Sequence, residues 1–265
     1  MDKFAFFVNG SHLFGAFKHM EVYVNDYQSL YRHLFEQAVG RWRNTMVAAA
    51  PPPAQLMRVY WYVVDSLDEW DLQNPRTRQY LSERFSDDRE IRARWVAEAS
   101  RQLAGADQGR IEQVAFDLCF DDFARWYDKK LTILAGMNRF YHAVEAASDF
   151  IEVCRCGRWK VDLLHKTLTE KGLDVWLATD MMGLQSNYDT ALIIAPDSDP
   201  IPSIDYVKGR GKQVGVFEFQ RGGAESRGRA FASQLKLSAD FVTTVFESDL
   251  VRLGIATKGE GEDFG

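Results

Sequence analysis

The sequence predicts an α/β fold built around a parallel β-sheet, and three features support this prediction. Phe4–Val8 and Thr190–Ala195 are short apolar runs, typical of strands buried on both faces, which belong mostly to parallel sheets. Helical patterns alternate with strand patterns along the chain, which implies right-handed crossovers. Asp197 and Asp199 directly follow the later run, and open α/β sheets bind ligands beyond the carboxyl ends of their strands.

The composition describes a chain that can bury a sizeable core. It has 265 residues, 46% of them hydrophobic, enough for one large α/β domain or one domain with a long insertion. The net charge of −6 argues against a generally basic nucleic-acid-binding surface and leaves only local basic patches. The three cysteines make no disulfide framework, and neither a signal peptide nor a membrane-spanning apolar run is visible. We therefore expect a cytoplasmic protein without a membrane partner.

The first part of the chain is predicted to form strand, helix and strand. Phe4–Val8 ends in the polar turn Asn9–Phe14, a candidate edge of a site. Asp26 is expected to cap a helix that continues through Trp42, because apolar residues recur there at helical spacing. After a proline-rich linker, the alternating residues of Leu56–Val64 indicate a second strand.

Residues 65–147 are predicted to form a helical insertion. Asp87–Leu103 places apolar side chains at four-residue steps on one face, and Phe120–Ala147 indicates a helix or helix pair broken near Gly136. We expect the insertion to serve packing, a protein partner or homo-oligomer formation. Its aromatic side chains should form a core, since such residues dominate helix packing: Trp70, Phe85, Trp95, Phe116, Phe120, Phe123, Trp126 and Tyr127.

The next part of the chain is predicted to form a strand and two helices. Phe150–Cys154 indicates the strand, and a basic turn follows it. Val161–Lys171 would then be a helix that Gly172 ends. Asp174 is expected to cap a second helix, Val175–Leu184.

The remaining elements follow the acidic pair. Beyond Gly254 we expect a frayed acidic tail. Before this tail the sequence predicts a helix over Ile201–Lys208 and a strand over Gln213–Phe217. A glycine-rich basic loop at residues 221–229, a helix through Leu235 and a last strand over Asp240–Thr244 follow.

Asp197 and Asp199 stand on a turn held by neighbouring prolines. Two carboxylates this close repel one another unless a hard cation lies between them, and Mg²⁺ or Mn²⁺ prefers oxygen ligands. Turns also collect aspartates for capping reasons. The pair therefore indicates a metal site only together with the rest of the chain.

Three blocks of the sequence resemble the NYN domain family, a branch of the PIN-like nuclease superfamily. They are Phe6-Phe-Val-Asn-Gly-Ser-His-Leu13, Lys171-Gly-Leu-Asp-Val-Trp-Leu-Ala-Thr-Asp-Met181 and Tyr188-Asp-Thr-Ala-Leu-Ile-Ile-Ala-Pro-Asp-Ser-Asp199, and Gly209-Arg-Gly-Lys-Gln-Val214 continues the match. The second and third blocks are specific in this order and spacing, whereas residues 65–147 match poorly. The resemblance implies a PIN-like parallel-sheet sandwich with helices on both faces and a helical insertion. It would be a single domain over residues 1–254 with a flexible acidic tail at 255–265.

The resemblance also implies a metal-dependent catalytic site. The family's acidic cluster would fall on Asn9, Asp180, Asp197 and Asp199, as ligands of Mg²⁺ or Mn²⁺. Asp174 matches a family aspartate as well, but we assign it to capping. The family usually has Asp at position 9. Asn9 can still offer a carbonyl oxygen to a cation, but it removes one negative charge and supplies no carboxylate base.

Two polar residues near this cluster are candidates for substrate binding. His12 stands where the family usually has Asn, and it would contact a phosphate or shuttle a proton, or simply begin a helix. Ser198 would bond a phosphate or hold the turn. Pro196 and Pro200 also depart from the family, which usually has Gly and an aromatic residue there.

The activity that the resemblance implies is hydrolysis of RNA, with single strands favoured. An acidic pocket repels the RNA backbone, so basic groups must bracket it and follow the phosphates. Each basic cluster also fits an ordinary solvated face. The candidates are Arg155, Arg158, Lys160, Lys171, Arg210, Lys212, and Arg221, Arg227 and Arg229 of the loop at 221–229.

Other functions stay open on the sequence alone. A catalytically dead relative that binds RNA or a protein partner fits Asn9 well. A glycosyltransferase that uses Mn²⁺ fits only Asp197 and Asp199. A phosphatase of the haloacid dehalogenase type needs its Asp-x-Asp at the first strand, which ends here in Asn9.

Overall fold

The computed structural model describes residues 1–45, 52–196, 198–224 and 234–259. The chain divides into two compact units. The first comprises Met1–Val64, Phe140–Gly157 and Gly172–Gly265, and the second comprises Asp65–Arg139 and Arg158–Lys171. The second unit therefore contains most of the expected insertion together with a later stretch of the chain. The organisation as one domain with an insertion stays a prediction.

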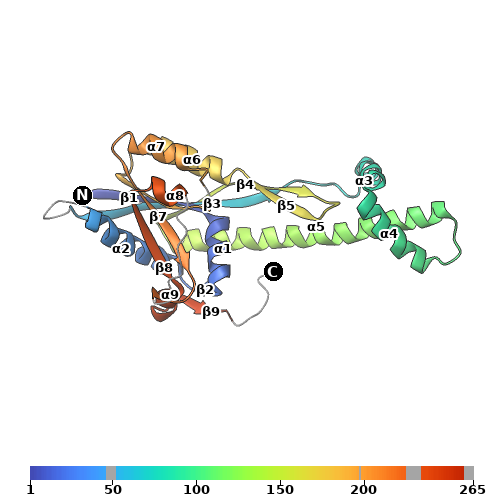
Figure 1. Ribbon diagram of the computed structural model, residues 1–265, viewed down its shortest axis with the longest axis horizontal. Helices are drawn as coiled ribbons and strands as arrows, with labels where there is room; N and C mark the ends of the chain where they lie inside the picture. Colours follow the sequence, from blue (N-terminus) through green and yellow to red (C-terminus); the bar gives the residue numbers. More distant parts are fainter. Residues whose placement is uncertain (46–51, 197, 225–233, 260–265) are drawn as a thin grey trace. The chain divides into compact units, whose positions relative to one another are not determined.

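The main sheet has seven strands in the order β5-β4-β3-β1-β6-β7-β8 (Figure 1). β1 pairs in parallel with β3 and β6, β6 with β7, and β7 with β8, whereas β5 is antiparallel to β4. The predicted, mostly parallel α/β sheet is confirmed. Its strands are β1 (Asp2–Asn9), β3 (Ala54–Leu67), β4 (Ile151–Asp162), β5 (Thr167–Lys171), β6 (Thr190–Ile194), β7 (Gln213–Gln220) and β8 (Phe241–Phe246).

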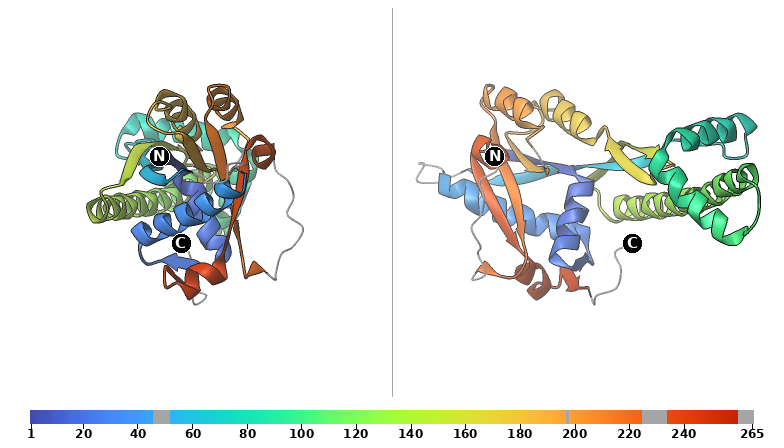
Figure 2. Two further views of the ribbon diagram at one scale, coloured as in Figure 1. Left: turned by 90° about the vertical axis from the view of Figure 1, so that its left-hand side faces the viewer. Right: turned by 45° about the vertical axis from the view of Figure 1, so that its right-hand side comes forward.

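Helices of the first unit cover both faces of its part of the sheet, as predicted (Figure 2). Successive side chains of a strand point to opposite faces, so β1 contacts both helical layers. The ring of Phe4 lies 5.1 Å from that of Trp42 in α2 on one face. On the other face the ring of Phe7 lies 5.3 Å from that of Tyr188, which follows α6 and donates its hydroxyl to the Met181 carbonyl of that helix. The layers contain α1 (Gly10–Met20) and α2 (Tyr27–Thr45) on the first side, and α6 (Leu173–Gly183) and α7 (Ile201–Lys208) on the second.

The predicted cap of α2 is present. Oδ1 of Asp26 accepts a hydrogen bond from the backbone N–H of Gln28 at 2.9 Å, and Oδ2 accepts one from the Ser29 hydroxyl at 2.6 Å. The Ser29 bond is the main reason why the pKa of Asp26 lies below its usual value. Such a cap satisfies helix N–H groups that have no partner within the helix.

The C-terminal part of the first unit continues further than the sequence suggested. After α8 (Gln234–Ser238) and β8 come α9 (Glu247–Arg252) and β9 (Ala256–Lys258). β9 pairs antiparallel with β2 (Val22–Val24) in a small second sheet. The expectation of a frayed tail directly after Gly254 is therefore wrong up to Lys258, because backbone pairing with β2 holds this segment.

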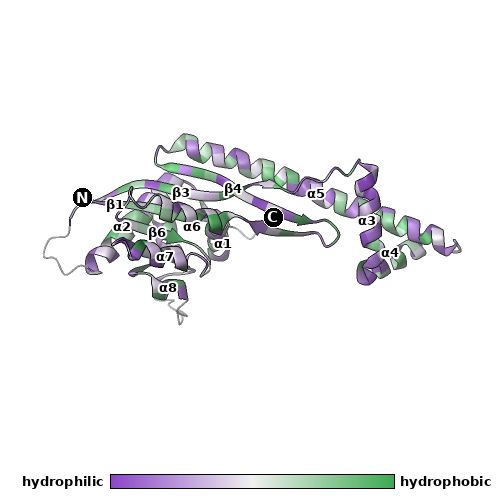
Figure 3. Ribbon diagram, turned by 90° about the horizontal axis from the view of Figure 1, so that it is seen from above, coloured by the Kyte–Doolittle hydropathy of each residue, from purple (hydrophilic) through white to green (hydrophobic). Residues whose placement is uncertain are grey.

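The second unit is mainly helical, as predicted. α3 (Pro75–Asp87) and α4 (Arg89–Gln102) begin at side-chain caps, Asn74 and Asp88, and both carry many hydrophilic residues (Figure 3). The third helix, α5 (Gln108–Ala147), continues into the first unit. The expected aromatic core forms in part, with buried Phe85, Phe116, Phe120, Phe123 and Tyr127; Trp70, Trp95 and Trp126 are only partly buried.

The predicted break near Gly136 is wrong. α5 is a continuous helix of 40 residues that passes through this glycine. A glycine inside a helix costs only about 1 kcal/mol relative to alanine, which strong helix formers on both sides of Gly136 can offset. No helix among the described residues combines the length and the apolar content that crossing a bilayer would need.

The predicted helix over Val161–Lys171 is wrong, since this segment forms a hairpin of β4 and β5. Thr167–Lys171 alternates between more and less exposed positions, and its two β-branched threonines favour a strand. Lys166 adopts a left-handed φ of 52° at the turn. Leu163 and Leu164 are buried in the turn between the two strands. Arg155, Arg158 and Lys160 lie in β4, not in a basic turn.

Gly172 begins a helix and does not end one. Its φ of 103° lies in the region that favours glycine, and an added Cβ would meet the carbonyl oxygen of Cys156 at 3.0 Å. The residue is the N-cap of α6 and offers no side-chain hydrogen bond. It therefore makes the sharp change from β5 into α6 possible.

We predict that Glu247 makes the stability of the first unit sensitive to acid. This buried carboxylate accepts the Gly222 N–H at 3.0 Å and pairs with the Lys258 ammonium at 3.1 Å. Burial raises the pKa of Glu247, but these two partners outweigh burial and hold it below the usual value. Its contribution is therefore present above the unfolded pKa, near 4.3, and is lost as the pH falls through the folded value.

Glu247→Gln should lower the free energy of unfolding at pH 7 by roughly 1–2 kcal/mol and reduce the loss of stability between pH 5 and pH 3. Urea denaturation across this range measures both effects. Glu36→Gln on the exposed face of α2 is the matched control and should change neither. Equal acid sensitivity of the wild-type chain and Glu247→Gln would contradict the assignment.

Candidate functional site

Asn9 lies at the carboxyl end of β1, the strand between β3 and β6. It is one of the few buried polar residues in the part of the chain that the structure describes, and it is 2% exposed. In parallel α/β sheets this edge is where ligands bind. Val8 pairs with Ile194, so the segment after β6, which leads to Asp197, begins beside Asn9.

Both polar atoms of the Asn9 amide form hydrogen bonds. Its Nδ2 donates a hydrogen bond to Oδ1 of Asp174 at 2.9 Å, and its Oδ1 accepts the backbone N–H of His12 at 3.0 Å. The second bond makes Asn9 the N-cap of α1. The Asp174 carboxyl group therefore accepts a hydrogen bond from a neutral amide and not from a cationic side chain.

Close packing fixes the position of Asn9 and of α1. A Cβ at Gly10 would lie 2.8 Å from the carbonyl oxygen of Tyr62 and 2.9 Å from Nε1 of Trp61, so only glycine fits without movement. Asn9 pairs with Tyr62 in the parallel register of β1 and β3. The end of β1 and the start of α1 therefore lie directly against β3.

A second hydrogen bond joins α6 to the sheet. The Tyr62 hydroxyl donates to Oδ2 of Asp180 at 3.0 Å, on the same helix as Asp174. Burial is the main cause of the strongly raised pKa of Tyr62, and the charges of Cys154 and Asp180 add to it. The phenol therefore stays protonated and keeps donating to Asp180. Asn9 and Tyr62 bond to two aspartates of one helix, on one face of the sheet.

A cavity of about 340 Å³ lies next to this edge in the first unit. The side chain of His12, whose backbone bonds to Asn9, lines it together with Pro196, the residue before Asp197. Lys236 and Glu218 also line it and form an ion pair of 2.6 Å with largely buried side chains. The cavity thus places an imidazole and a paired cation beside the end of β6.

The comparison with known families supplies the identity of the fold. The model of the NYN domain matches residues 70–244. The chain belongs to the NYN domain family. NYN domains are part of the PIN-like nuclease superfamily. No curated protein and no solved structure matches the chain.

The NYN match includes most of the helical segment, which the sequence blocks suggested would match poorly, but it does not include Asn9 or His12. NYN nucleases act on RNA and PIN-like nucleases generally use divalent metals. These are properties of the family.

The predicted acidic residues differ in their location and in their hydrogen-bond partners. Asp180 bonds to Tyr62 on α6. Asp199 and Ser198 are exposed in the segment before α7, where the Ser198 carbonyl accepts the N–H of Ile201 at 2.9 Å. Asp197 lies outside the described residues. The shared site of these aspartates stays a prediction.

The predicted basic residues that the structure describes have different partners. Arg221 pairs with Glu21 at 2.6 Å, and Arg155 pairs with Glu145. Lys171 belongs to the second unit and is exposed on β5. Arg227 and Arg229 lie outside the described residues.

The described side chains do not by themselves fit a divalent metal. Among the residues that the structure describes, no three of His, Cys, Asp or Glu gather in a group that could hold one. The Asn9 side chain presents an N–H to the Asp174 oxygen. An aspartate at position 9 would present an oxygen at the same place.

Asp174 is the residue whose position the sequence did not reveal. We expected it to cap α6, but Gly172 is the N-cap and Asp174 lies in the first turn, bonded to Asn9. The sequence contained one usable signal, because Asp174 falls on an aspartate of the Lys171–Met181 block that resembles the family. Its short spacing from the helix start favoured the capping interpretation.

We predict that Asn9→Asp destabilises the metal-free chain at neutral pH. The substitution replaces an N–H donor by an oxygen and places two carboxylates within hydrogen-bonding distance. One pKa of the pair then rises above its unfolded value near 4. Stability should fall as the pH rises from about 4 to the raised pKa, by roughly 1–3 kcal/mol at pH 7.

Urea denaturation at a series of pH values in EDTA measures this effect. The exchange variant Asn9→Asp with Asp174→Asn restores one donor facing one carboxylate, so it should recover most of the lost stability. Asn187→Asp, at an exposed position, is the control for added charge. Wild-type stability of Asn9→Asp at pH 7 would show that the two side chains do not depend on one another.

Proposed function

We propose that this chain is a ribonuclease of the NYN type that hydrolyses RNA with a divalent metal, Mg²⁺ or Mn²⁺, and that Asn9 makes it weak as the sequence stands. The observation that carries the proposal is the hydrogen bond between Asn9 and Asp174. It lies at the carboxyl edge of the sheet, where the segment towards Asp197 begins. Membership of the NYN family supports RNA as the substrate.

The weakness follows from the chemistry of Asn9. Hydrolysis of a phosphodiester needs a group that takes a proton from water, and a neutral amide cannot act as such a base. One oxygen of Asp174 already accepts the amide N–H of Asn9, so that oxygen is occupied. The shape of the edge is kept, because Asn and Asp have nearly the same size. Binding of RNA should therefore persist where hydrolysis is slow.

Other residues of the first unit would hold the substrate in this proposal. His12 lines the cavity beside the end of β6, and its imidazole can donate to a phosphate oxygen. Ser198, which is exposed, can donate a hydroxyl from the segment after Asp197. Asp180, Asp197 and Asp199 stay the predicted acidic partners of Asp174.

We predict that Asn9→Asp raises cleavage of labelled single-stranded RNA in Mn²⁺ by at least an order of magnitude over the wild-type chain. One amide-for-acid exchange in a catalytic group can change rates by orders of magnitude. The added charge also strengthens an oxygen-ligand site. Time courses on denaturing gels, with and without EDTA, give the rates.

Two double variants test which carboxylates take part. Asn9→Asp with Asp174→Asn, and Asn9→Asp with Asp197→Asn, should each lose the gain. Asn187→Asp adds the same charge at an exposed position and should leave cleavage unchanged. RNA bound but cut by none of the variants would favour a catalytically dead RNA-binding protein, and the absence of both would leave a role in binding a protein partner.

A further inference from the structure

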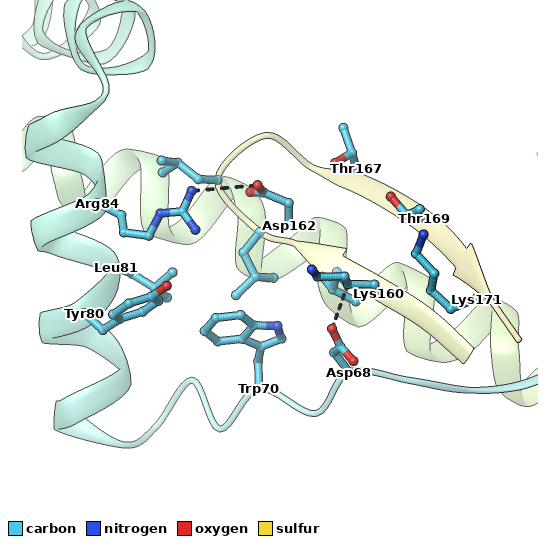
Figure 4. Close-up of a pocket in the computed structure, with 13 residues that line it drawn as sticks. Asp68, Trp70, Tyr80, Leu81, Arg84, Lys160, Asp162, Thr167, Thr169 and Lys171 are labelled. Atoms are coloured by element: carbon cyan, nitrogen blue, oxygen red, sulfur yellow. Dashed lines mark hydrogen bonds and ion pairs between the residues drawn. The ribbon is translucent and has the colours of Figure 1, made fainter. Parts of the chain in front are cut away.

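The second unit contains a larger cavity than the one beside Asn9. Its volume is about 590 Å³, within the range of ligand pockets. The β4–β5 hairpin forms one wall, α3 another, and the segment after β3 the floor (Figure 4). All of its lining residues belong to the second unit.

The floor and the α3 wall of this cavity each present an aromatic ring. Trp70 and Tyr80 stack with ring centroids 6.1 Å apart and planes inclined by 22°. The Trp70 backbone N–H donates to the Tyr127 hydroxyl at 3.0 Å, and that hydroxyl donates to the Asp68 carbonyl at 2.9 Å. The main chain beneath the rings is thus held in place. Tyr80 is 46% exposed, so the pair offers an accessible surface.

The indole N–H of Trp70 is buried and has no hydrogen-bond partner among the described residues. In Figure 4 the nitrogen side of the ring is turned towards Lys160. Leaving such a donor unpaired costs free energy. An acceptor atom of a ligand would pair with it only after a small shift of the side chains that cover the nitrogen.

The charged groups of the wall leave an excess of positive charge. Both carboxylates have partners: Asp68 lies 3.3 Å from Nε of Arg158, and Asp162 lies 3.2 Å from Nδ1 of His165 and 4.0 Å from Arg84. Burial raises the pKa of Asp162, but the hydrogen bonds from His165 outweigh burial and lower it. Both carboxylates of the wall therefore already have a partner.

The wall of the cavity also carries two lysines, which differ from the two carboxylates in their lack of an ion-pair partner among the described residues. Lys160 and Lys171 are exposed, and neither forms an ion pair within the part of the chain that the structure describes. Thr169 stands opposite Lys160 in the hairpin register, and Thr169 and Lys171 line the same cavity. Two ammonium groups and a hydroxyl suit a phosphate, since lysine binds phosphate as a point charge.

We propose that this cavity binds one nucleotide of a single-stranded RNA, with its base against Trp70 and Tyr80 and its phosphate at Lys160 and Lys171. The inference rests on the proposed function for the choice of RNA, and it assigns the second unit a part in holding the substrate. Only an unstacked base can lie on an aromatic surface, which selects single strands. An acidic peptide would match the lysines but has no base to place against the rings.

The experiment measures binding of a labelled single-stranded RNA oligonucleotide to the full chain in EDTA, where a metal-dependent cleavage is absent, by fluorescence anisotropy at several salt concentrations. For a single strand, each phosphate contact contributes about 0.7 to the slope of log K against log salt. The double variant Lys160→Gln/Lys171→Gln should therefore lose about 1.4 of this slope. Arg125→Gln/Lys129→Gln removes the same charge from exposed positions of α5 and should keep the slope.

The base contact is tested with Trp70. Trp70→Leu should weaken binding about 5- to 150-fold, the range for loss of one stacked base, without changing the salt slope. Trp70→Phe keeps a ring while it removes the indole N–H, so its loss should be smaller. Thermal unfolding of each variant identifies any variant that fails to fold. If Trp70→Leu fails to fold, Trp70→Phe still tests the base contact.

The results separate this inference from the proposed function. Wild-type binding that the lysine and Trp70 variants leave unchanged overturns the inference alone. A smaller salt slope without a Trp70 effect, or competition by poly-glutamate as strong as by RNA, overturns it in favour of a site for acidic polymers. Loss of binding in these variants supports it even if Asn9→Asp cuts no RNA, in which case only the proposed hydrolysis fails. A wild-type chain that binds no RNA overturns both.

Discussion

The hydrogen bond from Asn9 to Asp174 is the interaction on which the arrangement of the candidate site depends. The same amide caps α1 through the His12 N–H, so one side chain connects β1, α1 and α6. With Tyr62 bonded to Asp180, α6 is attached to adjacent strands at two points. The site is therefore part of the packing of the first unit, and its geometry is held by bonds that do not require a ligand.

A site arranged in this way combines two opposing properties. The buried amide removes the repulsion that an acidic cluster would create, which favours a stable edge of the sheet. It also removes the charge and the basicity on which metal-dependent hydrolysis relies. Gly10 and Gly172 keep the surrounding backbone close-packed, so a change at position 9 alters the chemistry of the edge more than its shape. Stability and reactivity are thus set by the same side chain.

Sequence patterns predicted the parts of the fold whose signal is local. Phe4–Val8 and Thr190–Ala195 were recognisable because strands covered on both faces become continuous apolar runs. The β4–β5 hairpin was not, since the alternation of Thr167–Lys171 is short. The contact of Asp174 with Asn9 joins residues 165 positions apart, and no local pattern contains it. The pocket around Trp70 likewise depends on which rings stay accessible after packing.

The position of β1 in the sheet also has a consequence for how the chain folds as it is made. β1 is complete at residue 9, but its neighbour β6 ends only at residue 194. At translation rates of roughly 5–20 residues per second, one edge of this apolar strand waits on the order of ten seconds or more for its partner. An early intermediate that holds only β1 and β3 would expose that edge, and such unpaired strands are prone to aggregate. Chaperones that shield hydrophobic strands should accordingly matter most before β6 is made.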